Sequence, residues 1–142
     1  MSTGLCGLAA VAHGSTLVVT GGTTSGDYMV AGVETFNTLE QVWVQHVPMK
    51  IARSDHAAVV MLSSVFISGG ISGVSQVSSS CEVLHLDGEG EAASPALPNL
   101  PDMLCARAGH SAVQHSNKVF VIGGDFQGNI ETSEIFDIET FT

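Results

Sequence analysis

Three short runs of β-branched and aromatic residues, each followed by a pair of glycines, set the pattern of this chain. The runs occupy 17–20, 65–68 and 119–122. Such runs are typical of buried strands, and the glycines that follow permit a sharp change of direction. The glycine pair recurs after 48 residues (21 to 69) and again after 54 (69 to 123). The chain therefore contains an internal repeat, which predicts a repetitive architecture.

Each of these runs has a companion before it and another after it. The preceding companions are short apolar or mixed runs at 9–12, 57–62 and 111–115. The following companions start at an acidic residue after a polar loop: Glu34, Glu82 and Glu134. Each repeat is thus predicted to contain at least three short strands joined by turns and loops.

A fourth strand is predicted in two of the repeats. In the first, residues 41–46 alternate polar and apolar positions around Trp43, as a half-buried outer strand does. In the second, glycine and proline dominate the corresponding stretch, so a strand is expected only near 92–97. No segment combines a 3.6-residue period with helix caps, so the sequence predicts an all-β chain with little or no helix.

Composition narrows the classes of partner. Acidic residues outnumber basic ones by 14 to 4, the net charge is −10, and charged residues make up only 13% of the chain. Nucleic acids and anionic membranes are bound by clustered lysine and arginine, so neither is an expected partner. No apolar run approaches the ~18 residues of a membrane span. Three widely spaced cysteines without a CxxC motif predict neither disulfides nor a metal site, which favours a reducing, cytoplasmic setting.

The repeat resembles the kelch repeat of β-propellers. The resemblance is carried by the three glycine pairs, the three acidic residues, Trp43, and Arg-x-x-His at 53–56 and 107–110. Methionine stands four residues before each arginine, at Met49 after a proline and at Met103. The first repeat departs from the pattern, since Leu5 and Leu8 replace the arginine and the histidine.

The resemblance implies three four-stranded antiparallel blades, approximately 1–47, 48–100 and 101–142, of which the last is incomplete. Propellers usually have 4–8 blades, so three form an open or partial propeller. The missing blades could belong to a longer chain, or two copies could complete a six-bladed ring as a homodimer. A third possibility is a subunit whose open faces are covered by other proteins. Uncovered, such edges and faces favour aggregation.

The loops after the glycine pairs are the candidate partner-binding surface, because they vary while the strand frame persists. Their alternative interpretation is as solvated turns. In kelch domains these loops project from one face, beside the arginine loops. The candidate contact residues are Arg53, Arg107, Asp27, Tyr28, Ser72, Gln76, Asp125, Phe126, Gln127 and Asn129.

The repeated charged residues have two interpretations. Arg53 and Arg107 could grip acidic groups of a partner, since guanidinium binds carboxylates bidentately. They could instead form a structural ion pair or bind backbone carbonyls that order the loop. The three glutamates are predicted to be structural, with an arginine or a backbone N–H as partner. His56 and His110 recur with the repeat and are predicted to be structural as well.

The function implied by the resemblance is non-catalytic: a scaffold that binds a protein partner through the loops of one face. In the family this often means recruiting substrates to a ubiquitin ligase or binding cytoskeletal proteins. The alternative is part of a kelch-like enzyme or sugar-binding protein, of the sugar oxidase or mutarotase class. Such a site needs a carboxylate, an arginine and a tyrosine converging at the channel mouth. No catalytic residue, metal or cofactor is predicted.

Overall fold

The computed structural model describes the whole chain except residues 2, 75, 87–91, 96–99, 126–127 and 141. Within the described residues every regular element is a β-strand, and all strand pairs are antiparallel, which confirms the predicted all-β class. None of the sheets closes on itself. No helix long and apolar enough to cross a membrane occurs in this part of the chain.

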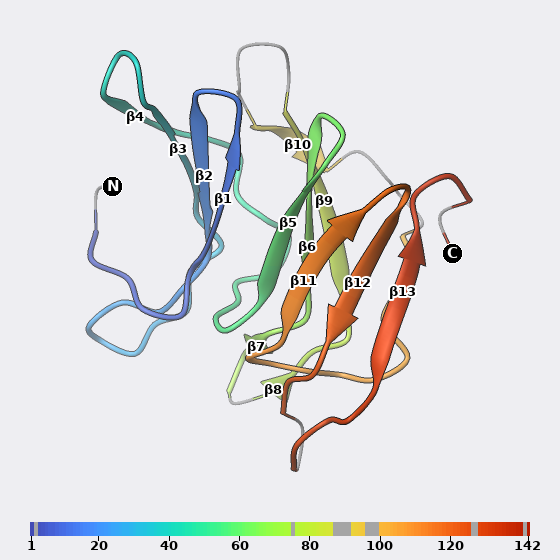
Figure 1. Cartoon of the computed structure of the whole chain (residues 1–142). Helices are drawn as coiled ribbons and strands as arrows, with labels where there is room; N and C mark the ends of the chain where they lie inside the picture. Colours follow the sequence, from blue (N-terminus) through green and yellow to red (C-terminus); the bar gives the residue numbers. More distant parts are fainter. Residues whose placement is uncertain (2, 75, 87–91, 96–99, 126–127, 141) are drawn as a thin grey trace.

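Three sheets follow one another along the chain (Figure 1). The first has the order β1-β2-β3-β4, with strands Ala9–His13, Thr16–Thr20, Val33–Asn37 and Val42–Gln45. The second has the order β10-β9-β6-β5, with β5 at Ala57–Met61, β6 at Ser64–Ser68, β9 at Cys81–Leu86 and β10 at Ala92–Pro95. The third has the order β11-β12-β13, with strands Ser111–His115, Lys118–Ile122 and Ser133–Asp137. A small hairpin, β7 (Ile71–Ser72) and β8 (Gln76–Val77), forms a separate two-stranded sheet.

The strand bounds agree closely with the sequence pattern. β11 occupies 111–115 as predicted, β4 lies within 41–46, and β10 lies within 92–97. The third strands begin one residue before their acidic residues. The β7–β8 hairpin was expected to be a loop, and its strands of two residues each are too short for alternation to show in a sequence.

Two apolar cores lie between successive sheets. In the first core, Val18 and Val33 of the first sheet pack with Val65 and Ile67 of the second. Successive strand residues point to opposite faces, so Phe66 instead enters the second core, where its ring stacks 5.1 Å from that of Phe136. The methionines that precede the arginines, Met49 and Met103, are buried one in each core. The sheets therefore pack face to face in chain order.

The glycine pairs are the points at which one repeat meets the backbone of the next. The N–H of Gly70 donates to the carbonyl of Arg107 at 2.9 Å, as that of Gly22 does to Arg53 at 2.8 Å. Gly69 has φ of +61°, and a Cβ there would overlap the Arg107 carbonyl oxygen and lie 2.7 Å from Cε1 of His110. This position thus needs glycine both for its left-handed backbone and for the close approach of its neighbour.

Replacing Gly69 with alanine should separate these two requirements when it is compared with Gly73→Ala. Gly73, in the β7–β8 hairpin, has nearly the same φ, +60°, but open space among the described residues where a Cβ would lie. We expect Gly73→Ala to lower the free energy of unfolding by about 1–2 kcal/mol, the cost of the left-handed conformation. Gly69→Ala should cost at least ~2 kcal/mol more, because the third repeat must move. Equal losses in urea denaturation would show that the junction tolerates the displacement.

Candidate functional site

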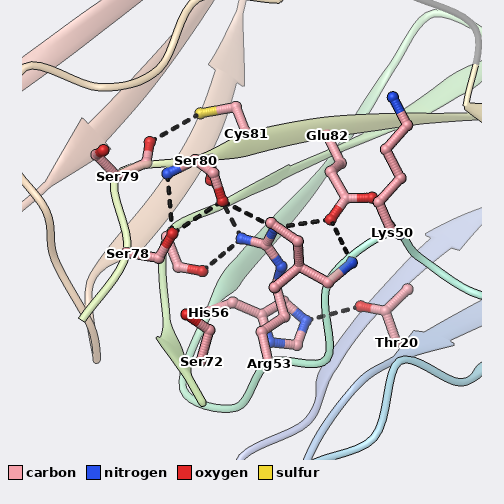
Figure 2. A network of polar contacts seen from close by, with 12 residues as sticks. Thr20, Lys50, Arg53, His56, Ser72, Ser78, Ser79, Ser80, Cys81 and Glu82 are labelled. Atoms are coloured by element: carbon pink, nitrogen blue, oxygen red, sulfur yellow. Dashed lines mark hydrogen bonds and ion pairs between the residues drawn. The ribbon is translucent and has the colours of Figure 1, made fainter. Parts of the chain in front are cut away.

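Arg53 is completely buried and holds the second repeat together (Figure 2). Its Nη1 donates to the carbonyls of Gly69 at 2.6 Å and Ser80 at 3.1 Å. Its Nη2 donates to Oγ of Ser80 at 3.1 Å and to Oε1 of Glu82 at 2.7 Å. One guanidinium thus joins the end of β6 to the start of β9, on either side of the exposed loop.

Glu82 completes this frame by binding the segment that enters the repeat. Its Oε2 accepts the N–H of Lys50 at 2.7 Å, and its Oε1 accepts the N–H of Ile51 at 3.3 Å. The carboxylate is buried, and its charge is neutralised by Arg53. The buried carboxylate accepts hydrogen bonds from a charged guanidinium and from backbone N–H groups. It therefore holds the strands joined by Arg53 and the segment that enters the repeat in fixed positions.

The third repeat contains the same frame. Nη1 of Arg107 donates to the carbonyls of Gly123 at 2.7 Å and Thr132 at 3.0 Å, and Nη2 donates to Glu134 at 2.7 Å. Glu134 accepts the N–H of Leu104 at 2.6 Å. Partial burial acts to raise the pKa of Glu134, but the hydrogen bonds from Leu104 and Arg107 outweigh it and leave the pKa below its usual value.

These contacts correct one expectation from the sequence. Arg53 and Arg107 were candidate partner contacts, but both side chains are fully buried and their Nη atoms donate inward. A partner on the surface would not reach them. They take the structural role that was the other interpretation, and Glu82 and Glu134 pair with them as predicted.

Two histidines connect neighbouring repeats. Nε2 of His56 lies 2.9 Å from Oγ1 of Thr20, and Nε2 of His110 lies 2.9 Å from Oγ of Ser68. Burial, followed by the charge of the adjacent arginine, lowers the pKa of both histidines to about 4. Nδ1 of each has no hydrogen-bond partner among the described residues, so a second ring proton would be unsatisfied. Both histidines are therefore neutral at physiological pH, in a structural role.

The first repeat has leucine where the others have arginine. Leu5, Gly21, Gly32 and Glu34 line a cavity of about 180 Å³ at the equivalent of the guanidinium site. The α-ammonium of Met1 lies 3.6 Å from Oε2 of Glu34. A cation therefore still approaches this glutamate, although the buried guanidinium is lost.

Three loops lie at one end of the sheets, at the bottom of the view in Figure 1. Each loop begins with an antiparallel bridge to the residue that follows the arginine position: Cys6 with Thr23, Ser54 with Ile71, and Ala108 with Asp125. We call this surface the loop face and define it by the described residues 23–29, 71–74, 76–77, 125 and 128–129. The bridges hold the start of all three loops, and the arginine frames of the second and third repeats also hold the far ends of their loops.

The first two loops expose most of the predicted contact residues. Asp27 is exposed with φ of +59°, and the side chain of Tyr28 is 75% exposed. Ser72 is half-buried and its Oγ donates to the Gln76 carbonyl at 3.4 Å, while the Gln76 side chain is exposed. The loop face thus offers an aromatic ring and polar groups from separate repeats.

The third loop is described in part. Asp125 is exposed and its Oδ1 accepts the N–H of Gly128 at 3.0 Å, and Asn129 is exposed. The predicted contacts Phe126 and Gln127 lie outside the described residues.

Asp55 belongs to the loop face in space, although it lies outside the three loops and was not a predicted contact. Its N–H donates to the carbonyl of Gly7, and its own carbonyl accepts the N–H of Gly109, both at 2.8 Å. It occupies the left-handed position that Gly7 and Gly109 hold in the other repeats, and its side chain is exposed. Aligning the repeats would have revealed it as a charged residue in a glycine position.

The loop face is acidic. It carries Asp27, Asp55 and Asp125, all exposed. Of the four basic residues in the chain, two are the buried arginines, and Lys118 pairs with Asp137 at 3.1 Å. In the part of the chain that the structure describes, no group of three His, Cys, Asp or Glu residues could hold a metal ion.

Comparison with known proteins assigns no family to this geometry. No protein-family model matches the chain, and no curated protein matches it in sequence.

Removing the charge of Glu82 should strongly destabilise the protein. Glu82→Gln leaves a fully buried guanidinium without its counter-charge, and breaking a buried ion pair in this way costs about 3–5 kcal/mol. The free energy of unfolding from urea denaturation measures the loss. The exposed Glu40→Gln is the matched control and should change it by less than ~0.5 kcal/mol. Similar values for the two variants would mean that the Arg53 frame does not hold the repeat together.

Acidification should weaken the junctions between repeats. The folded-state pKa of His56 and His110 is about 4, below the unfolded value of 6.5. Unfolding therefore takes up protons between these values, and stability that is present above pH 6.5 is lost as the pH falls towards 4. Each histidine contributes up to about 3 kcal/mol.

The measurement is the free energy of unfolding from pH 7.5 to 4.5. The double variant His56→Gln/His110→Gln should show a flatter profile than the native protein, with the exposed His115→Gln as the control for the substitution itself. An unchanged slope in the double variant would contradict the assignment.

Proposed function

We propose that this chain is a kelch-type partial β-propeller that binds a protein partner through its loop face. The observation that carries the proposal is that three loops of different sequence project from one end of the sheets. Each is tied by the same type of bridge to the arginine position of its repeat. A rigid frame with variable loops is the usual way in which a repeat scaffold provides recognition.

The blade arrangement in this proposal is supported by how the sheets join. In the first and third sheets the strands are hydrogen-bonded in chain order, and the second differs only by the inserted β7–β8 hairpin. The first strands, β1, β5 and β11, contact one another in sequence (Figure 1). Blades of a propeller likewise line a common axis with their first strands and stack face to face.

The charge of the loop face defines the chemistry of the partner. Asp27, Asp55 and Asp125 favour a segment with lysine or arginine, and the acidic peptides bound by some kelch domains would be repelled. The exposed Tyr28 offers an aromatic anchor of the kind that often dominates binding energy. The proposed partner is therefore a protein segment that combines basic and apolar side chains.

The enzyme alternative has less support from these observations. A sugar oxidase or mutarotase site would need arginine and tyrosine directed at one substrate. Arg53 and Arg107 donate hydrogen bonds within their own repeats, whereas Tyr28 is exposed on the first loop. These contacts favour a partner-binding function over an enzymatic one.

Selection from a random peptide library on the immobilised chain would test the proposal. We expect basic peptides with an apolar residue, and Tyr28→Ala, Gln76→Ala or Asp125→Asn should each weaken their binding about 5- to 30-fold. Leu39→Ala, in the exposed turn between β3 and β4 at the opposite end, should leave binding unchanged. Failure to select a peptide, or peptides that bind every loop variant as well as the native chain, would contradict the proposal.

A further inference from the structure

We infer that two copies of this chain close a six-bladed ring, in which the third sheet of each copy packs on the first sheet of the other. The inference rests on the blade arrangement proposed above. The evidence is a complementarity between the outer face of the first sheet and the outer face of the third. It occurs at the position where each internal junction has a hydrogen bond between a hydroxyl and a histidine.

Each internal junction contains the same polar pair. A hydroxyl at the last residue of the second strand meets the repeat histidine of the following sheet: Thr20 with His56, and Ser68 with His110, both at 2.9 Å. The strand registers fix the equivalence, because β2, β6 and β12 each have five residues and each ends directly before a glycine pair. Ile122 in the third repeat therefore occupies the position that Thr20 holds in the first repeat and Ser68 holds in the second.

At the open ends, both members of this pair are replaced by apolar residues. Ile122 stands where the hydroxyl would be and is 50% exposed. Leu8 stands where the histidine would be, since it follows Leu5 as His56 follows Arg53. A histidine packed against Ile122 would have no hydroxyl to bond with. A hydroxyl packed against Leu8 would likewise have no histidine as a partner. Ile122 against Leu8 is the arrangement that leaves no polar group unpaired.

The outer faces keep the apolar residues that internal junctions bury. Phe66 and Val83 of the second sheet are buried against the third. Their equivalents on the outer face of the third sheet are Phe120 and Ile135, and Ile135 is 54% exposed. An exposed apolar face of this kind is a docking surface rather than a solvated one.

The first sheet has a matching outer face. Val65 and Leu84 of the second sheet are buried against the first. Their equivalents on the outer face of the first sheet are Leu17, which is 38% exposed, and Phe36, which packs 5.0 Å from Trp43. The two outer faces thus resemble the two halves of one internal junction.

The backbone at the open end also matches. Gly21 and Gly69 are each covered by a carbonyl and a methionine of the next repeat, whereas a Cβ at Gly123 would meet no described atom within 4 Å. Met1 precedes Leu5 by four residues, the same offset as Met49 before Arg53 and Met103 before Arg107. A second copy would therefore present a methionine and a carbonyl to Gly123.

Two copies of the three sheets described here would supply six blades, a number within the 4–8 blades of closed propellers. Head-to-tail contacts give a closed ring when the rotation between subunits is complete.

Light scattering after size exclusion tests the ring on the whole chain. We expect a single species of twice the 14.7 kDa chain mass. Ile122→Ser and Leu8→His should each raise the dimer dissociation constant at least tenfold, because each leaves a polar group without a partner. Gly123→Ala should have a similar effect, because its Cβ would meet the carbonyl of the second copy.

The decisive variant is the double Leu8→His/Ile122→Ser. It recreates the pair formed by Ser68 and His110, so it should restore the dimer towards the native dissociation constant. Leu62→Ser, at the exposed turn between β5 and β6, is the control and should leave the mass unchanged. A monomer, an open series of larger species, or a double variant no tighter than the single ones would overturn the inference.

The two proposals fail separately. A monomer that still binds the selected peptides through Tyr28 would refute the ring and leave the proposed binding function standing. A dimer that binds no peptide would refute the binding function and leave the ring standing.

Discussion

The buried bond between arginine and glutamate is the interaction on which the rest of this structure depends. In the second and third repeats a single guanidinium binds the carbonyl after the second strand, the start of the third strand and a carboxylate. The same carboxylate accepts N–H groups from the segment that enters the repeat. Three pieces of chain that are distant in sequence are thereby held at one point, and the exposed loop between them has fixed ends.

Burial of these charges also determines the character of the surface. A chain with four basic residues uses two of them inside the protein, so the acidic residues dominate outside. This is why we propose a basic partner for the loop face rather than the acidic one that Arg53 and Arg107 first indicated. The stability of the frame and the acidity of the surface therefore have a common origin.

The sequence predicted the frame well because the frame is local and repeated. Runs that end in Gly-Gly identified the second strands, and the acidic residues marked the third strands to within one residue. The pairing of Glu82 and Glu134 with the arginines was also predicted. What the sequence left open was whether Arg53 faces a partner or the interior. That choice depends on the carbonyls of Gly69 and Ser80, which only the folded backbone brings together. The place of Asp55 on the loop face depends in the same way on hydrogen bonds between distant segments. The β7–β8 hairpin is local, and it was missed because its strands have only two residues each.

The packing of sheets in chain order has a consequence for how the protein opens. The middle sheet is covered on both faces by apolar cores, whereas each outer sheet has one such core. In a single copy, before the ring inferred above closes, the three sheets form a linear array, and cooperative units of such an array are lost from the ends inwards. In the single copy, amide protons of β6 and β9 should therefore be the last to exchange with solvent deuterium, and the outer sheets should fray while the second sheet stays folded. The most persistent part of a single copy is the second sheet, whose strands β6 and β9 are joined by the fully buried Arg53, and the outer sheets are where it is most able to adapt.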